Sequence, residues 1–292
     1  FDKNAELTDI IPEVGFGFEE IGSITAEPCE GNPKPRLWRL KKSKALVVYY
    51  GLKNDGEEKL SEKLTNKKFK IPIGVNIAKT NCKETAETEK GIEDYVKSYK
   101  KFLELDIGDY FTINISCPNT FGGEPFHNAA KLDKLLSALE KHPTKKPIFL
   151  KISPDLTDKE VDAILEISAL HHINGFICTN LTKKRENLKI LDEQVPKNGG
   201  ISGKAVEDIS DKMIASIHQK TKGKYIIIGC GGVFCAQDAY KKIRLGASLI
   251  ELITGMIFEG PQLISQINLE LSSLLKKDGF KNIKEAVGYD FK

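Results

Sequence analysis

The 292-residue sequence lacks any apolar run long enough to cross a bilayer: its longest, such as residues 45–50 and 225–228, fall far short of the roughly 20 residues a spanning helix needs. No signal peptide is recognisable. Neither sign of charge is in excess, since 44 basic and 41 acidic residues give a net charge of +3, which gives no reason to expect nucleic acid as a partner. Position 1 is Phe rather than Met, so we expect the natural chain to begin earlier.

The sequence also lacks paired cysteines. Six cysteines are present, but none forms a Cys-x-x-Cys pair, and the closest two, Cys230 and Cys235, have no second pair to complete a zinc site. A chain of this length does not need disulfides to fold. We therefore expect free thiols, a reducing compartment and no metal centre.

Short apolar runs alternate with longer amphipathic ones along the chain. The runs expected to be buried strands are residues 17–25, 71–77, 110–116, 147–153, 175–180, 225–231 and 249–254. Helical patterns fall between them, at 57–64, 84–105, 129–141, 158–171, 207–221, 236–245 and 261–277. Thr157 is placed to cap the fourth of these helices, and residues 37–40 and 45–49 predict an additional hairpin.

Repeated strand–helix units predict either a closed barrel or a doubly wound sheet. Polar or glycine-rich segments follow nearly every strand instead of gathering at one switch point, which favours an α/β fold, the (β/α)8 TIM barrel. Seven strands can be counted, so we expect the first barrel strand to precede Phe1. No linker or change of composition divides the sequence, which predicts one domain over residues 1–292.

Two consecutive strand ends near the C-terminus carry glycines, at Gly231-Gly232 and at Thr254-Gly255. Backbone N–H groups of such loops can converge on an anion, and barrels often bind phosphate after strands 7 and 8. Glycines also make tight turns without any ligand, but their presence in two consecutive units favours a phosphate site.

Polar side chains interrupt or end other apolar strands. Lys151 lies inside an apolar run, where a lysine is costly to bury unless it meets an anion, so we predict that it steadies negative charge on a reduced cofactor. A lysine that extends to solvent at the strand end is the alternative. Asn76, Asn114 and Asn180 lie at three strand ends and suit a heteroaromatic ring with mixed donors and acceptors.

The segment Asn114-Ile-Ser-Cys-Pro-Asn-Thr120 is the most informative one. Cys117 follows a predicted strand and precedes a proline that cannot continue a regular element, which exposes the thiol. Inert packing is the commoner role of a cysteine, but the flanking Asn114 and Asn119 favour a function.

This segment resembles the catalytic loop of dihydroorotate dehydrogenases. The resemblance covers essentially the whole chain, through Phe1-Asp-Lys-Asn, Gly15-Phe-Gly-Phe-Glu-Glu-Ile-Gly-Ser-Ile-Thr, Glu30-Gly-Asn-Pro-Lys-Pro-Arg, Gly74-Val-Asn, Leu150-Lys-Ile-Ser-Pro-Asp-Leu, Gly199-Gly-Ile-Ser-Gly-Lys and Gly229-Cys-Gly-Gly-Val. The C-terminal segments Phe258-Glu-Gly-Pro, Asp278-Gly-Phe and Glu285-Ala-Val-Gly-Tyr-Asp resemble the membrane-associated, quinone-using class in particular.

The resemblance implies an FMN-dependent oxidoreductase that converts dihydroorotate to orotate in pyrimidine (UMP) biosynthesis. Cys117 matches the base that removes the C5 proton, while a hydride passes from C6 to the flavin near Lys151. The positions that match FMN contacts are Lys3, Ser23, Asn76, Asn114, Lys151, Thr179, Gly203, Gly231, Gly232 and Thr254. Those that match substrate contacts are Lys3, Asn114, Asn119 and Asn180.

Four positions depart from the quinone-using pattern. That class has serine in place of Cys117, which is typical of the soluble class, and commonly tyrosine in place of Ile253. The family pattern also has a substrate-binding asparagine in place of Val48 and usually a hydroxyl residue in place of Leu181. FMN recognition is therefore implied more fully than dihydroorotate recognition.

The resemblance also implies a place in the cell and a partner. It points to a cytoplasmic enzyme or one peripheral to a mitochondrial inner or bacterial plasma membrane, with quinone as a possible acceptor and any membrane segment lying outside this sequence. The alternatives are another FMN oxidoreductase on the same scaffold, of which a tRNA dihydrouridine synthase is a weaker version, and a non-catalytic flavoprotein.

Overall fold

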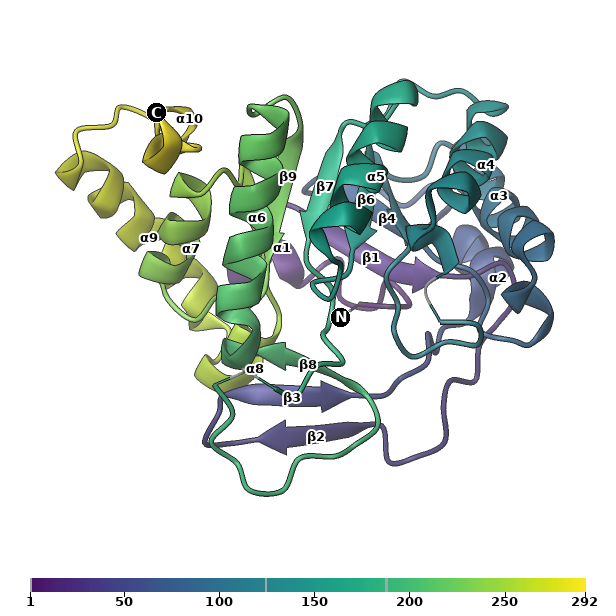
Figure 1. Cartoon of the computed structure of the whole chain (residues 1–292), viewed down its shortest axis with the longest axis horizontal. Helices are drawn as coiled ribbons and strands as arrows, with labels where there is room; N and C mark the ends of the chain where they lie inside the picture. Colours follow the sequence, from purple (N-terminus) through teal and green to yellow (C-terminus); the bar gives the residue numbers. More distant parts are fainter. Residues whose placement is uncertain (1, 124, 187–188) are drawn as a thin grey trace. The chain divides into compact units, whose positions relative to one another are not determined.

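The computed structural model describes residues 2–123, 125–186 and 189–292 (Figure 1). Its contacts divide the chain into two compact units. The first comprises Phe1–Lys34, Tyr49–Lys151 and Leu156–Asn174, and the second comprises Pro35–Val48, Ile152–Asp155 and Gly175–Lys292. Phe1, the first residue of the predicted N-terminal motif, lies outside the described residues. The single-domain organisation stays a prediction, and the two units are described in turn.

The first unit is built on parallel strands with helices between them. Its strands, in spatial order, are β1 (Glu19–Ile24), β4 (Ile73–Ile77), β5 (Tyr110–Asn114) and β6 (Ile148–Ile152). Its helices are α1 (Ile11–Val14), α2 (Gly56–Leu64), α3 (Thr88–Glu104), α4 (Ala129–Glu140) and α5 (Asp158–Leu170), with short 3-10 turns η1 (Glu84–Ala86) and η2 (Pro125–His127). Every residue of β4 and β5 is buried, as expected for strands that are covered on both faces.

Local sequence explains why these helices form where they do. On α3 the aromatic residues Tyr95, Tyr99 and Phe102 recur at helical spacing and are all buried. Tyr99 packs edge-on against Phe111 of β5 with ring centroids 4.9 Å apart, so α3 is fixed against the sheet. Thr157 caps α5 through a capping box with Glu160, which confirms the predicted helix start.

The second unit combines parallel strands with an antiparallel sheet. Its parallel strands are β7 (Gly175–Cys178), β9 (Ile226–Cys230) and β10 (Leu249–Glu251). Its helices are α6 (Glu207–Thr221), α7 (Ala236–Arg244), α8 (Thr254–Glu259), α9 (Gln262–Lys277) and α10 (Ile283–Ala286), with 3-10 turns η3 (Lys204–Val206) and η4 (Tyr289–Phe291). One prediction was wrong in detail: the last strand ends at Glu251, and Thr254 and Gly255 begin α8 instead of forming a loop.

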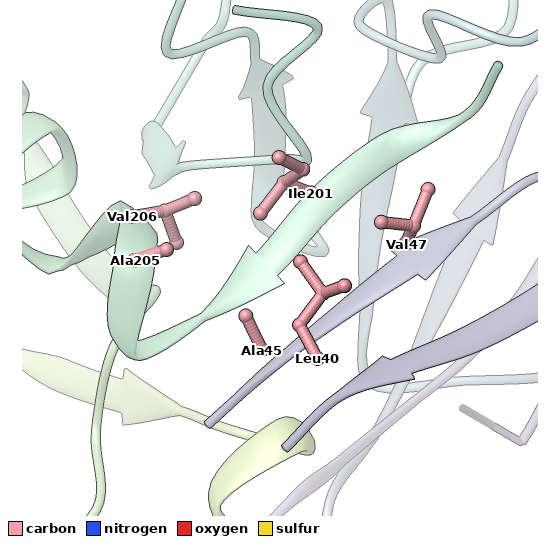
Figure 2. Close-up of a cluster of buried hydrophobic side chains, with 6 residues drawn as sticks. All are labelled: Leu40, Ala45, Val47, Ile201, Ala205 and Val206. Carbon is pink, nitrogen blue, oxygen red and sulfur yellow. The ribbon is translucent and has the colours of Figure 1, made fainter. Parts of the chain in front are cut away.

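The antiparallel sheet contains the predicted hairpin. Strand β2 (Leu37–Leu40) pairs with β3 (Ala45–Val48), and β3 pairs on its other edge with β8 (Gly200–Gly203), so β3 is central (Figure 1). Figure 2 shows the buried cluster that packs this sheet against η3, the turn that precedes α6. Its members are Leu40, Ala45, Val47, Ile201, Ala205 and Val206. The hairpin is thus part of a packed core and not a surface extension.

Two further findings concern membranes and metals. Within the part of the chain that the structure describes, no helix combines the length and the apolar character that crossing a bilayer requires. The same residues contain no group of three or more His, Cys, Asp or Glu side chains arranged to hold a metal ion. All six cysteines are free thiols.

Candidate functional site

A buried carboxylate organises the polar strand ends of the first unit. Glu20 on β1 accepts hydrogen bonds from Lys151 Nζ (2.8 Å), Asn76 Nδ2 (2.7 Å) and Thr112 Oγ1 (2.6 Å). The Lys151 and Glu20 side chains are only 16% and 8% exposed, so Lys151 does not extend to solvent. Glu20 is thus a counter-charge that holds the ammonium in one place, while the role of Lys151 toward a reduced cofactor stays a prediction.

Asn114, at the end of β5, lies beside the same strands. Its Nδ2 donates to Ser23 Oγ at 2.8 Å, its Oδ1 accepts from the backbone and hydroxyl of Ser116, and its carbonyl accepts from Tyr95 Oη at 2.7 Å. Asp2 is bonded to β1, the strand that contains Ser23, because the Asp2 carbonyl accepts the Gly22 N–H at 3.2 Å. The backbone at Lys3, the next residue, therefore lies beside β1 in the first unit.

Cys117 lies in a loop that neighbouring segments hold in place. Thr120 Oγ1 bridges the carbonyls of Cys117 and Gly123, both at 3.2 Å. Asn32 Nδ2 donates to the carbonyl of Asn119 at 3.2 Å. The thiol is half-buried and lines a small pocket together with Asn114 and Thr120. The expected exposure of the thiol on the loop after β5 is therefore partial.

In the second unit, the residues predicted to bind phosphate lie close together. A Cβ on Gly203 would be 2.8 Å from Thr254 Cγ2, and one on Gly255 would be 2.1 Å from the carbonyl oxygen of Val233, so larger residues would not fit at either glycine. The hydroxyls of Thr254 and Ser202 are hydrogen-bonded at 2.9 Å. The end of β8, the start of α8 and the loop after β9 thus meet.

The Gly231-Gly232 loop offers unused backbone donors. Both glycines have positive φ, at 127° and 76°, which only glycine adopts without strain. Among the described residues, neither N–H group donates to an acceptor. Adjacent unpaired amides in such a turn form an anion-binding concavity.

Thr179 and Asn180 follow β7 in the same unit. The Thr179 N–H donates to the Cys230 carbonyl at 2.7 Å, and the Asn180 N–H donates to the Ile152 carbonyl at 3.0 Å. Asn180 Oδ1 accepts the N–H of Leu181 at 2.8 Å. These two bonds hold the backbone of Thr179 and Asn180 against the ends of neighbouring strands.

Two of the departures from the family pattern lie beside one residue. Val48 of β3 pairs with Gly200 of β8, and a Cβ on Gly200 would be 2.6 Å from Leu181 Cβ. Val48 and Leu181 are both half-buried. The apolar replacements thus occur together around Gly200.

Each unit contains a buried polar atom that suits a ligand such as FMN. Asn76 Oδ1 and Thr179 Oγ1 are both shielded from solvent and have no hydrogen-bond partner among the described residues. An unsatisfied buried acceptor or hydroxyl is rare in a folded protein and calls for a partner. In the first unit Asn76 Oδ1 can therefore accept a hydrogen bond from a ligand, and in the second unit Thr179 Oγ1 and the amides of Gly231 and Gly232 can bind polar or anionic groups.

Sequence reasoning missed two residues of the first unit. Glu20 and Lys79 were not singled out, although Glu20 lies inside β1 and Lys79 comes two residues after β4. A charged residue inside or just after a buried strand was the signal that identified Lys151, and it would have identified both.

Comparison with known proteins places the chain in a family. The model of the dihydroorotate dehydrogenase family matches residues 1–275. The chain is 38% identical over 290 residues to the dihydroorotate dehydrogenase (quinone) of Haloarcula marismortui, covering 99% of this chain and 80% of that protein. It is 41% identical over 293 residues to the enzyme of the same name from Bartonella tribocorum, covering 98% and 79%.

Solved structures agree. The ligand-free DHODH from Eimeria tenella superposes with a TM-score of 0.92 at 32% identity, covering 100% of this chain and 87% of that one. The structure of that DHODH in complex with ferulenol gives a TM-score of 0.91 at 31% identity and covers 83% of that chain. The architecture is therefore an α/β, TIM-barrel-like fold, and the chain belongs to the dihydroorotate dehydrogenase family.

Proposed function

We propose that this protein is a dihydroorotate dehydrogenase of pyrimidine biosynthesis, an oxidoreductase that converts dihydroorotate to orotate. The observation that carries the proposal is the arrangement in the first unit: the Cys117 thiol shares a pocket with Asn114, whose amide bonds Ser23 near the ion pair of Lys151 and Glu20. The family match over residues 1–275 supports it.

In this proposal FMN supplies the hydride acceptor for C6 of the substrate. In the first unit Lys3, Ser23, Asn76, Asn114 and Lys151 would hold it, and in the second Thr179, Gly203, Gly231, Gly232 and Thr254. The unpaired atoms Asn76 Oδ1 and Thr179 Oγ1 and the glycine amides favour such a ligand. Lys151, fixed by Glu20, would steady negative charge as the cofactor is reduced.

The protein's own residues handle the proton. As the base, the Cys117 thiolate would take the C5 proton of dihydroorotate and become a thiol, which then returns that proton to solvent. Lys3, Asn114, Asn119 and Asn180 would orient the substrate. The bonds to the backbone of Asn119 and to Thr120 limit the motion of the loop that carries the base.

We propose quinone as the electron acceptor, because the relatives described above are named dihydroorotate dehydrogenase (quinone). The same relatives favour a location at a membrane surface. The Cys117 base in place of serine distinguishes this chain from the quinone-using pattern. We also propose that the TIM-barrel-like fold is a full (β/α)8 barrel.

The decisive experiment is anaerobic reduction of the bound flavin by dihydroorotate. The flavin absorbance should bleach, with one orotate formed per flavin. Denaturing the protein should release FMN, whereas release of FAD or of no flavin would contradict the proposed phosphate site. A flavin that bleaches with dithionite but not with dihydroorotate would leave a flavoprotein with another substrate or none.

One observation favours a second candidate, an FMN oxidoreductase with a less polar ring substrate. Val48 and Leu181, which replace polar family residues, both lie beside Gly200. A paired loss of polar groups would reshape one wall of a pocket instead of weakening a single contact. Bleaching by another dihydropyrimidine faster than by dihydroorotate would select this candidate.

A further inference from the structure

Lys79 is a buried lysine with no role in the function proposed above. It follows β4 by two residues and is only 4% exposed. Among the described residues its ammonium has one hydrogen-bond acceptor, the carbonyl of Phe121 at 2.8 Å, and no carboxylate within 4 Å. An ammonium buried without a counter-charge is costly, so a fold that retains it needs an anion nearby.

The group best placed to be that anion is Cys117. Lys79 and Cys117 line the same small pocket, together with Asn114 and Thr120. Burial lowers the pKa of Lys79, and Cys117 is the largest influence in the opposite direction, as expected when a thiolate lies near an ammonium.

The other titratable groups around Lys79 are Cys82, Asp94 and Cys29, and each raises the pKa of Lys79 less than Cys117 does. Asp94 of α3 accepts the Thr80 N–H at 2.8 Å, and burial raises its pKa. Cys29 is buried, which raises the pKa of its thiol, and its sulfur accepts the Asn81 N–H at 3.2 Å. Cys82 is hydrogen-bonded to Thr85, and the Tyr95 hydroxyl donates to Asn114.

We propose that Lys79 is a positioning residue whose ammonium stabilises the thiolate of Cys117. This inference rests on the proposed function, in which Cys117 is the base. A free thiol has a pKa of about 8.5 and is mostly protonated at neutral pH, so a base of this type needs a neighbouring cation to be active there. An opposite charge within about 4–6 Å lowers an acid's pKa by roughly 1–3 units.

Lys79 also holds the loop in position, and this second role must be separated from its charge. Its Nζ donates to the Phe121 carbonyl, while Asn81 Oδ1 accepts the Phe121 N–H at 2.9 Å. The two side chains thus clamp one residue of the Cys117 loop from both of its backbone groups. Asn81→Ala removes one half of the clamp without changing any charge, which makes it the matched control.

The first measurement needs no variant. Purified protein is treated with iodoacetamide over a range of pH, and the carbamidomethylated Cys117 peptide is quantified by mass spectrometry, apart from the other five cysteines. Because the thiolate displaces iodide and the thiol does not, the midpoint of rate against pH is the pKa of Cys117. We expect a midpoint clearly below about 8.5. A midpoint at or above that value overturns the proposal.

The second measurement compares variants. In Lys79→Met the midpoint should rise by about one unit or more, so alkylation at pH 7 slows about tenfold relative to its own plateau. Lys79→Arg, which keeps the charge, should retain most of the lowered midpoint. Asn81→Ala should change the plateau rate, which reports access to the loop, and leave the midpoint unchanged.

An unchanged midpoint in Lys79→Met, or an equal rise in Asn81→Ala, would show that the ammonium does not stabilise the thiolate. Neither result depends on turnover. Failure of the proposed function would instead appear as a flavin that dihydroorotate does not bleach, whatever the midpoint of Cys117.

Discussion

Replacing Glu19 with glutamine is expected to stabilise this protein above neutral pH. Glu19 begins β1 and is 7% exposed, so its carboxyl group is shielded from solvent. Burial, followed by the nearby carboxylate of Asp2, raises the pKa of Glu19 to about 7. The folded protein therefore holds a proton on Glu19 that the unfolded chain has already lost.

The direction and size of the effect follow from that shift. The stability that Glu19 contributes is fully present below pH 4.5, its ordinary pKa, and is lost as the pH rises through about 7. The difference of 7 − 4.5 = 2.5 units corresponds to at most about 3.4 kcal/mol at ~1.36 kcal/mol per unit. Solvent screening and local relaxation reduce this, so we expect about 2 kcal/mol. Glutamine has nearly the same volume and does not titrate, so it avoids the loss.

Urea unfolding at pH 5 and pH 8 tests the reasoning. The gain in the free energy of unfolding, measured as Glu19→Gln minus wild type, is compared at the two pH values. This gain should be about 2 kcal/mol larger at pH 8 than at pH 5. Glu6→Gln, at an exposed position of the same N-terminal segment, is the control and should leave the pH dependence unchanged. Parallel pH curves for the wild type and Glu19→Gln would refute the argument.

Three more predictions follow from the site and the surface. Cys117→Ala should slow flavin reduction by dihydroorotate by roughly 10²–10⁴-fold in stopped-flow absorbance while FMN stays bound, and unchanged kinetics would remove Cys117 from the mechanism. Val48→Asn should tighten orotate binding about tenfold in flavin-fluorescence titrations, because a hydrogen bond to a charged group contributes about 1.5–3 kcal/mol; no change would mean that Val48 does not face the substrate. Although burial opposes it, hydrogen bonds with Asp133 and Glu140 raise the pKa of His171. The contribution of His171 to stability should be present below pH 6.5 and be lost as the pH rises through the raised pKa. In His171→Gln the melting temperature should therefore depend less on pH than in the wild type. An unchanged dependence would argue against this role.

The sequence predicted the strands and helices well because their signals are local. Each of the seven predicted strands is present within a few residues. The runs at β4 and β5 are buried as expected, whereas no residue of β10 is buried, so the expectation of a buried strand at 249–254 was wrong. Strand β8 was missed because Gly200–Gly203 has two glycines in four residues and no strand propensity of its own. It forms because β3 pairs with it along its free edge, and the local hydrophobic pattern of residues 200–203 does not indicate that pairing.

The same distinction applies to the site. That Lys151 needs an anion could be predicted from one position, because burial of a lysine has a known cost. That the anion is Glu20, 131 residues away, depends on the register between β1 and its neighbours. Likewise, the closeness of Gly255 to Val233 is a property of the packed chain and not of either motif.

The pairing of β3 with β8 has a consequence for synthesis on the ribosome. The hairpin of β2 and β3 emerges early, but its partner follows only after a further 203 − 48 = 155 residues. At roughly 5–20 residues per second, the edge of β3 stays open for about 8 to 30 seconds. An apolar strand with an unpaired edge can pair with another nascent chain during that time. Elongation speed between residues 48 and 203, and chaperone binding to the hairpin, should therefore influence how much newly made chain reaches the native state.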